Sequence, residues 1–171
     1  MNLTVNGVSL HVLDEGDGAP VLLLHGFPDF AALWRHQIPE LVRAGHRVIA
    51  PDRRGFGASG RPDRVEQYGV ATLVADVLGI LDTLGVDRAD VVGHDWGAAV
   101  GWALAGAVPA RVTRLAALSV GHPAGYFTDM RGLEALSSSR RHTPDLGGPS
   151  RGCGHGSRAT APFSARLRTF R

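Results

Sequence analysis

The stretch Val91-Val92-Gly93-His94-Asp95-Trp96-Gly97-Ala98-Ala99-Val100 predicts a strand, a tight turn and a helix in direct succession. Two β-branched valines precede the turn and a run of small apolar residues follows it, as expected for a short buried strand and then a closely packed helix. Gly93 and Gly97 stand two residues either side of Asp95, and we expect them to let the backbone bend sharply. The bend would place the Asp95 side chain at the carboxyl end of the strand, above the start of the helix.

This spacing matches the nucleophile elbow that is usually written G-x-S-x-G, with Asp95 in the place of the serine. An aspartate carboxylate is ionised at neutral pH, so it can attack carbon and form an ester without a base to activate it. The alternative is an ordinary strand-to-helix turn in which Asp95 caps the helix. So short a motif does not decide between the two on its own.

Strands alternate with helices along the rest of the first 120 residues. Alternating apolar and polar residues around Asn6-Gly7 predict a hairpin of edge strands. Continuous apolar runs predict buried strands, and apolar residues at helical spacing predict helices. The predicted strands cover residues 21–24, 47–50, 89–92 and 112–120, and the predicted helices run from Trp34 to Val42, Leu73 to Leu84 and Trp96 to Val108. We therefore expect an α/β fold with a doubly wound, mostly parallel sheet.

A second turn motif, His25-Gly26-Phe27-Pro28, directly follows the predicted strand at residues 21–24. Ligands bind at the carboxyl ends of the strands in doubly wound sheets. Both this motif and Asp95 lie at such ends. Two independent turn motifs at one edge of the sheet favour a catalytic site over a simple helix cap.

The composition excludes several classes of protein. The chain of 171 residues, 44% of them hydrophobic, has the length and composition of one globular domain. Its N-terminus shows no basic segment followed by an apolar one, and no run of about 18 apolar residues occurs, so we expect neither a signal peptide nor a membrane span. Cys153 is the only cysteine, which favours a cytoplasmic location.

A change of composition marks a boundary near Leu136. The net charge of +2 combines an acidic first part with a final segment that contains seven arginines and one aspartate. Gly, Pro, Ser and Arg replace apolar periodicity there, so we expect a disordered, solvated tail from a truncated or frameshifted reading of a longer gene, and no nucleic-acid partner. His142, Cys153 and His155 fit no standard zinc spacing, and no strand precedes His155, so we expect neither a metal site nor a catalytic base among them.

Together these pieces resemble the α/β-hydrolase superfamily, and within it the epoxide hydrolase branch. The motifs His25-Gly26-Phe27-Pro28, Asp52-Arg53-Arg54-Gly55-Phe56-Gly57-Ala58-Ser59 and Gly93-His94-Asp95-Trp96-Gly97 occur in the family's order and spacing. The resemblance covers residues 1–128, the expected N-terminal part of a hydrolase core, and leaves residues 129–171 outside it. It implies a hydrolase that opens small apolar epoxides to diols without a cofactor or a metal.

The resemblance also implies a role for each residue of the two turns. Asp95 is expected to open the ring and become esterified, and the backbone N–H groups of Phe27 and Trp96 to form the oxyanion hole. Six flanking residues are expected to support these loops: His25, Gly26, Pro28, Gly93, His94 and Gly97. Pro28 either follows a cis peptide bond that aims the Phe27 N–H inward or is the first residue of a helix.

Other prominent residues have simpler interpretations. Asp52, Arg53 and Arg54 are expected to form an ion-paired structural turn rather than a phosphate site, because no dinucleotide-binding pattern of strand, glycine-rich turn and helix surrounds them. Trp34 and Trp102 occur at helical spacing and are expected to be core residues.

Three parts of the family's machinery have no match in this sequence: the histidine that acts as general base, its orienting acid, and a cap domain with two tyrosines. Tyr68 and Tyr126 do not occupy cap positions, and the general base stays unassigned. We therefore expect an incomplete and inactive copy of the enzyme. The alternatives are a haloalkane-type dehalogenase with the same nucleophile and a non-catalytic remnant. Phe27 stands where such dehalogenases commonly carry asparagine, which favours the epoxide.

Overall fold

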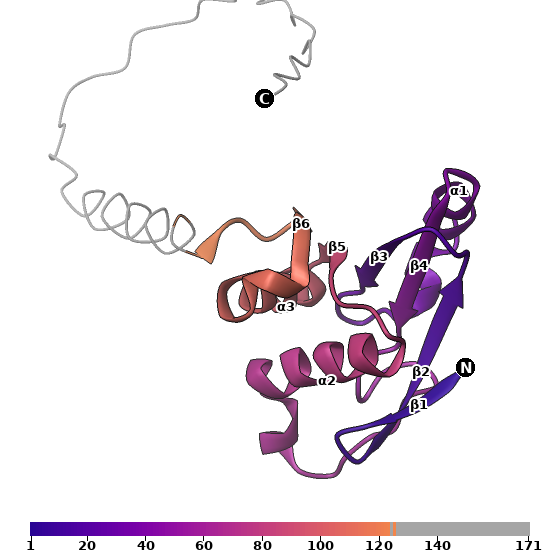
Figure 1. The fold of residues 1–171 in the computed structure, drawn as a ribbon. Helices are drawn as coiled ribbons and strands as arrows, with labels where there is room; N and C mark the ends of the chain where they lie inside the picture. The colour runs from indigo at the N-terminus through magenta and orange to yellow at the C-terminus, as the bar shows by residue number, and fades with distance from the viewer. Residues whose placement is uncertain (124, 126–171) are drawn as a thin grey trace, which may run out of the picture.

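The computed structural model describes residues 1–123 and residue 125, and these form a six-stranded, mostly parallel sheet (Figure 1). The strands are β1 (Asn2–Val5), β2 (Val8–Glu15), β3 (Ala19–Leu24), β4 (His46–Pro51), β5 (Ala89–His94) and β6 (Val112–Leu118), in the spatial order β1-β2-β4-β3-β5-β6. β1 and β2 form the predicted hairpin around Asn6 and Gly7, both of which have positive φ. The predicted mostly parallel sheet is confirmed.

Helices cover both faces of the sheet. They are η1 (Ala31–Trp34), α1 (Gln37–Arg43), η2 (Val65–Tyr68), α2 (Val70–Thr83), α3 (Trp96–Ala107) and η3 (Pro109–Arg111). Alternate residues of β3 enter two separate cores: Leu22 and Leu24 pack with α2 and α3, whereas Val21 and Leu23 pack with η1 and α1. The sheet is therefore doubly wound, as predicted. Among the helices in the described part of the chain, none has the length and hydropathy of a membrane span.

Two details of the predicted elements are wrong. The helix expected from Trp34 to Val42 is divided into η1 and α1. Pro39 lies in the first turn of α1, and its ring would clash with the carbonyl group four residues earlier, so the helix cannot continue back to Trp34. Trp34 is nevertheless a core residue, 5% exposed, whereas Trp102 is only half-buried and donates its indole N–H to the Val120 carbonyl at 3.2 Å.

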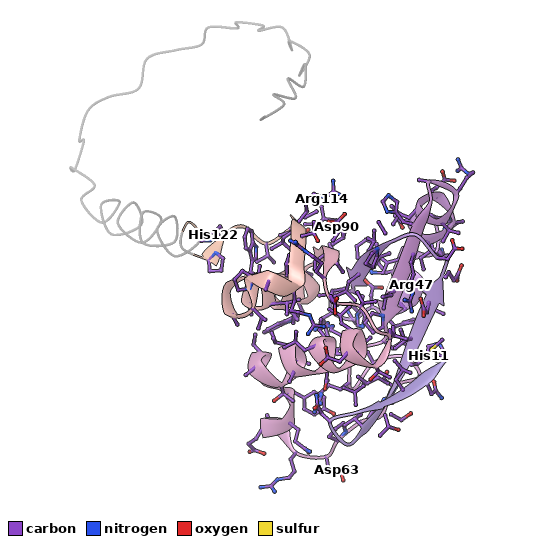
Figure 2. The ribbon with its side chains drawn as sticks, viewed as in Figure 1. His11, Arg47, Asp63, Asp90, Arg114 and His122 are labelled. Atoms are coloured by element: carbon purple, nitrogen blue, oxygen red, sulfur yellow. The ribbon has the colours of Figure 1, made fainter. Side chains whose placement is uncertain are left out.

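The pairing of β3 with β5 fixes the position of the two predicted turns. These strands are parallel, and Leu24 lies opposite Gly93. The loops that follow both strands therefore leave the same edge of the sheet. On the other side of β5, β6 continues the parallel sheet, and Arg114 on β6 donates from Nε to Asp90 on β5 at 3.0 Å (Figure 2).

Candidate active site

Asp95 connects β5 to α3 in a strained conformation, with φ +52° and ψ −122°. A positive φ at a residue other than glycine typically costs about 1–3 kcal/mol and persists only where the surroundings enforce it. Here the Asp95 N–H donates to the Leu118 carbonyl at 3.1 Å, and its own carbonyl accepts from the Ala98 N–H at 2.9 Å. Its side chain makes no helix-capping hydrogen bond. This geometry disagrees with the simple helix cap that the sequence left open.

The glycines around Asp95 permit the sharp bend by allowing neighbouring backbone segments to approach closely. A Cβ on Gly97 would lie 2.0 Å from the Leu24 carbonyl oxygen, and one on Gly93 would lie 2.5 Å from the Gly97 carbonyl oxygen. A Cβ on Gly26 would lie 2.6 Å from Cβ of Asp95. The unusual backbone conformation belongs to Asp95, and neither Gly93 nor Gly97 has a positive φ. The two glycines let the chain bend sharply, as expected, because they leave room for the neighbouring backbone.

The Asp95 carboxylate receives a hydrogen bond from the turn after β3. The Phe27 N–H donates to Oδ1 of Asp95 at 2.9 Å. The Phe27–Pro28 peptide bond is cis, and the next helical turn begins only at Ala31, so Pro28 is not the first residue of a helix. The backbone N–H groups of Phe27 and Trp96 hold the pKa of Asp95 below its ordinary value. The carboxylate is therefore ionised throughout the neutral range.

His25 is fully buried and links two loops. Its Nε2 accepts from the Arg53 N–H at 3.0 Å, which leaves the ring proton on Nδ1, and Nδ1 donates to the Gly26 carbonyl at 2.8 Å. Burial lowers the pKa of His25 to about 4, so the ring is neutral at pH 7. His94 is half-buried, and its Nδ1 has no hydrogen-bond partner within the described residues.

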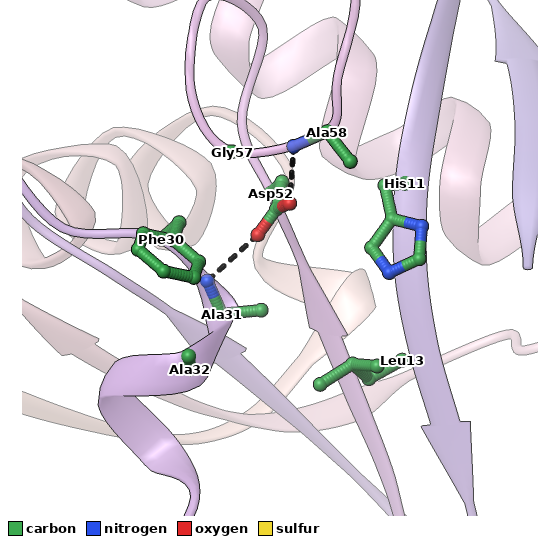
Figure 3. Close-up of a pocket in the computed structure, with 8 residues that line it drawn as sticks. All are labelled: His11, Leu13, Phe30, Ala31, Ala32, Asp52, Gly57 and Ala58. Atoms are coloured by element: carbon green, nitrogen blue, oxygen red, sulfur yellow. Dashed lines mark hydrogen bonds between the residues drawn. The ribbon is translucent and has the colours of Figure 1, made fainter.

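The loop after β4 forms a different ion pair from the one predicted. The Asp52 carboxylate accepts the N–H groups of Ala31 at 2.7 Å and Ala58 at 2.8 Å (Figure 3). Its two oxygens are thus occupied, and it pairs with neither neighbouring arginine. Arg54 instead binds Asp76 on α2 through two hydrogen bonds of 2.6 and 2.5 Å. The structural role of the turn is as predicted, but the partner comes from another element.

A pocket of about 420 Å³ lies between β2, η1 and this loop. Figure 3 shows the residues that line it. Its walls include His11, Leu13, Phe30 and Asp52. The Asp52 carboxylate binds the backbone of η1 and of the loop after β4, so it holds two walls of this pocket together.

A second pocket, of about 230 Å³, lies beside the turn that contains Asp95, because its walls include Trp96, the next residue, and Phe27, which donates to the Asp95 carboxylate. It is lined by Phe27, Arg53, Arg54, Phe56, Tyr68, Leu73 and Trp96. The side chains of Phe27 and Trp96 are 66% and 51% exposed, so an apolar surface flanks the carboxylate. Sequence reasoning missed Phe56, Tyr68 and Leu73 as lining residues, and only Phe56 carried a signal, because it belongs to one of the three family motifs. Tyr68 donates its hydroxyl proton to the Pro62 carbonyl at 2.7 Å.

The remaining predictions concern parts of the chain that the structure does not describe. Tyr126, His142, Cys153, His155 and the predicted tail at residues 129–171 all lie outside the described residues. Within residues 1–123 and 125, no group of three His, Cys, Asp or Glu side chains is arranged to hold a metal ion.

An acidic side chain on a strained turn after a central parallel strand, facing a backbone donor from the neighbouring strand, defines a hydrolase of the α/β class. The family model of the alpha/beta hydrolase fold matches residues 19–157, and the chain belongs to this family. The match extends beyond residue 128, where we placed the end of the hydrolase core, and that boundary stays a prediction.

The relatives of this chain include several epoxide hydrolases, which confirms the predicted branch of the superfamily. Epoxide hydrolase A from Mycobacterium tuberculosis is 53% identical over 117 residues, which are 67% of this chain and 36% of that protein. Epoxide Hydrolase A from Mycobacterium thermoresistibile is 42% identical, with a TM-score of 0.68 over 77% of this chain and 44% of its own. A mutant epoxide hydrolase from Bacillus megaterium, in complex with its naphthyloxy-propanediol product, is 38% identical, with a TM-score of 0.72 over 82% of this chain and 48% of its own. The chain thus spans less than half the length of these relatives.

Proposed function

We propose that this chain carries the nucleophile of an epoxide hydrolase, and that Asp95 is that nucleophile. One observation carries the proposal: Oδ1 of Asp95, on a residue with φ +52°, accepts the Phe27 N–H at 2.9 Å. The strained elbow presents the carboxylate at the edge of the sheet, and the donor is already aimed at one of its oxygens. The names of the relatives supply the substrate class.

In the first step, the second carboxylate oxygen, Oδ2, attacks a carbon of the epoxide ring. The bond between that carbon and the ring oxygen breaks, and its electron pair stays on the ring oxygen, which takes up a proton from water or from an acid outside the described residues. The product is an ester between Asp95 and the substrate. The Phe27 and Trp96 N–H groups hold the pKa of Asp95 below its ordinary value, so the carboxylate stays ionised and able to attack to a lower pH than a free aspartate.

In the second step, water attacks the carbonyl carbon of the ester. The oxygen that becomes an oxyanion is Oδ1, which already accepts the Phe27 N–H. The Phe27 and Trp96 N–H groups, the latter at the N-terminus of α3, would stabilise that charge as it forms. Cleavage of the acyl–oxygen bond releases the diol with Oδ2, and Asp95 keeps one oxygen from water.

The aromatic side chains beside Asp95 favour a substrate with an apolar group near the epoxide. Phe27, Phe56 and Trp96 line the adjoining pocket. Phe27 presents a ring at the position where a haloalkane dehalogenase would need an amide for the halide, so the dehalogenase alternative gains no support from this site. We further propose a cytoplasmic location, as the single cysteine suggests.

The test is the fate of oxygen in a single turnover. The first part of this chain is fused to the remaining segment of the Mycobacterium tuberculosis relative, and excess enzyme is mixed with an aryl glycidyl ether in heavy-oxygen water. The heavy oxygen is expected in the peptide that contains Asp95, because water attacks the ester carbonyl. Heavy oxygen found in the diol alone would exclude the covalent ester. Asp95→Asn is the control for labelling that does not depend on this carboxylate.

A further inference from the structure

Two consecutive arginines after β4 are buried to a similar degree but differ in their partners. Arg54 binds both oxygens of Asp76 and also donates to the Gln67 carbonyl at 2.9 Å. Arg53 is 7% exposed, and its Nε and Nη2 are buried without a hydrogen-bond partner in the described part of the chain. Its guanidinium group lies 5.2 Å from the centre of the Phe56 ring. A cation–π contact offsets only part of the desolvation of a buried cation.

Arg53 remains a cation despite its burial. Desolvation lowers the pKa of Arg53 to about 10, which still leaves it protonated at neutral pH. Asp95 is the acidic group that interacts with it electrostatically. The two side chains do not form an ion pair, and Oδ1 of Asp95 is hydrogen-bonded to Phe27. The site therefore contains a positive charge without a direct acceptor.

The pocket that Arg53 lines combines this charge with an aromatic wall. Phe27, Phe56, Tyr68 and Trp96 contribute to the 230 Å³ space beside Asp95. A planar guanidinium group matches a carboxylate through two parallel hydrogen bonds, and the aromatic side chains favour an aryl or alkyl group. One small molecule with both features would satisfy the whole pocket.

We propose that Arg53 and this aromatic pocket bind the carboxylate of the substrate, which is an epoxide that also carries an aryl or alkyl carboxylic acid. The assignment of an epoxide rests on the function proposed above, whereas the recognition of a carboxylate by Arg53 does not. Because Arg53 lines a pocket that adjoins the Asp95 elbow, it would select among epoxides without taking part in bond making. Arg53 is thus a specificity-determining residue.

The experiment measures equilibrium binding to the 171-residue chain by calorimetry, with phenylacetate and its neutral isostere phenylacetamide as probes. We expect the chain to bind phenylacetate at least about tenfold more tightly than phenylacetamide, since a charged bidentate pair exceeds a neutral contact by about this factor. Arg53→Met is expected to abolish that preference. Arg43→Met, which removes an exposed arginine on α1, is the matched control and should keep it. Equal binding of the two probes, or a preference that survives Arg53→Met, would overturn the proposal.

If Arg53→Met does not fold, as judged by circular dichroism, Arg53→Lys replaces it. Lysine keeps the charge but lacks the two parallel N–H donors of the guanidinium group, so the preference for phenylacetate should fall at least about threefold. An unchanged preference would overturn the proposal. These probes contain no epoxide and do not react with Asp95. The binding result is therefore independent of whether Asp95 forms an ester. If Asp95 takes up heavy oxygen in the fused enzyme but the enzyme shows no preference for a carboxylate, only the role of Arg53 is refuted and the proposed nucleophile is unaffected.

Discussion

Gly26→Ala removes the hydrogen bond on which the proposed chemistry depends. The added Cβ would lie 2.6 Å from Cβ and 2.8 Å from Oδ1 of Asp95. Carbon atoms in ordinary contact are roughly 3.5–4 Å apart, so the Asp95 side chain must shift by about 1 Å. In the unmodified protein, the Phe27 N–H donates to Oδ1 of Asp95 at 2.9 Å. A shift of that size takes the two atoms beyond the range of about 3.2 Å in which N–H···O bonds are effective.

Two effects should follow from the loss of this hydrogen bond. Removal of one oxyanion donor typically reduces the rate by about 10²–10³, or about 2.7–4 kcal/mol, so hydrolysis of the Asp95 ester should slow by that factor. The Phe27 N–H is also the largest cause of the lowered pKa of Asp95. Without it the pKa rises toward its ordinary value. Since only the ionised carboxylate attacks the epoxide, the acid limb of ester formation should move to higher pH.

The assay is the rate of Asp95 modification and of its reversal in the fused enzyme, followed by peptide mass spectrometry across about pH 3–8. Phe27→Leu is the matched control, because it changes the neighbouring ring and retains the backbone N–H. It should stay within about threefold of the unmodified protein, well below the loss of an oxyanion donor. The reasoning is refuted if Gly26→Ala keeps the normal pH profile and rate, or if Phe27→Leu causes the larger loss.

Three further predictions concern stability and turnover. Asp76→Asn leaves the Arg54 cation buried without its anion and should reduce the free energy of unfolding by about 3–5 kcal/mol, which urea denaturation measures; a loss below about 1 kcal/mol would contradict it. His25 has a folded pKa of about 4 against 6.5, so the unfolded chain binds more protons in that interval. Stability should therefore fall as the pH drops from 6.5 towards 4, and His25→Gln should flatten the dependence of the urea midpoint on pH. The 171-residue chain on its own should not turn over epoxides repeatedly, because each absent acid–base group is typically worth about 10²–10⁴ in rate. Multiple turnovers that disappear in Asp95→Ala would disprove this.

The sequence was sufficient to predict those parts of the fold that short-range patterns determine. Continuous apolar runs located the parallel strands, and the motif around Asp95 located the junction of β5 and α3. The break before α1 was also readable, because Pro39 stands in the expected helix and its effect on the preceding turn is steric.

Features that depend on distant residues were not accessible in this way. The ion pair between Arg54 and Asp76 joins a loop to a helix 22 positions later, and nothing local distinguishes Asp76 from other helical acids. The strain at Asp95 likewise results from neighbours on other elements, including Leu118 at the end of β6. The difference between Arg53 and Arg54 arises from the direction of each side chain, which an Arg-Arg doublet does not reveal.

The register of β3 and β5 explains why the nucleophile and its donor form one unit. Leu24 pairs with Gly93, and Gly26 and Asp95 each follow two residues later, so the chain brings them together at the same height above the sheet. Gly97 then packs against the Leu24 carbonyl, which holds the start of α3 over the same strand. The Leu118 carbonyl and the Ala98 N–H complete the unit by holding the backbone of Asp95. Formation of the ester should therefore depend on contacts that are all present in the described part of the chain, whereas its hydrolysis requires a base from elsewhere. We therefore expect the Asp95 ester to accumulate in the 171-residue chain, which can form it but cannot hydrolyse it, and to disappear in the fused enzyme.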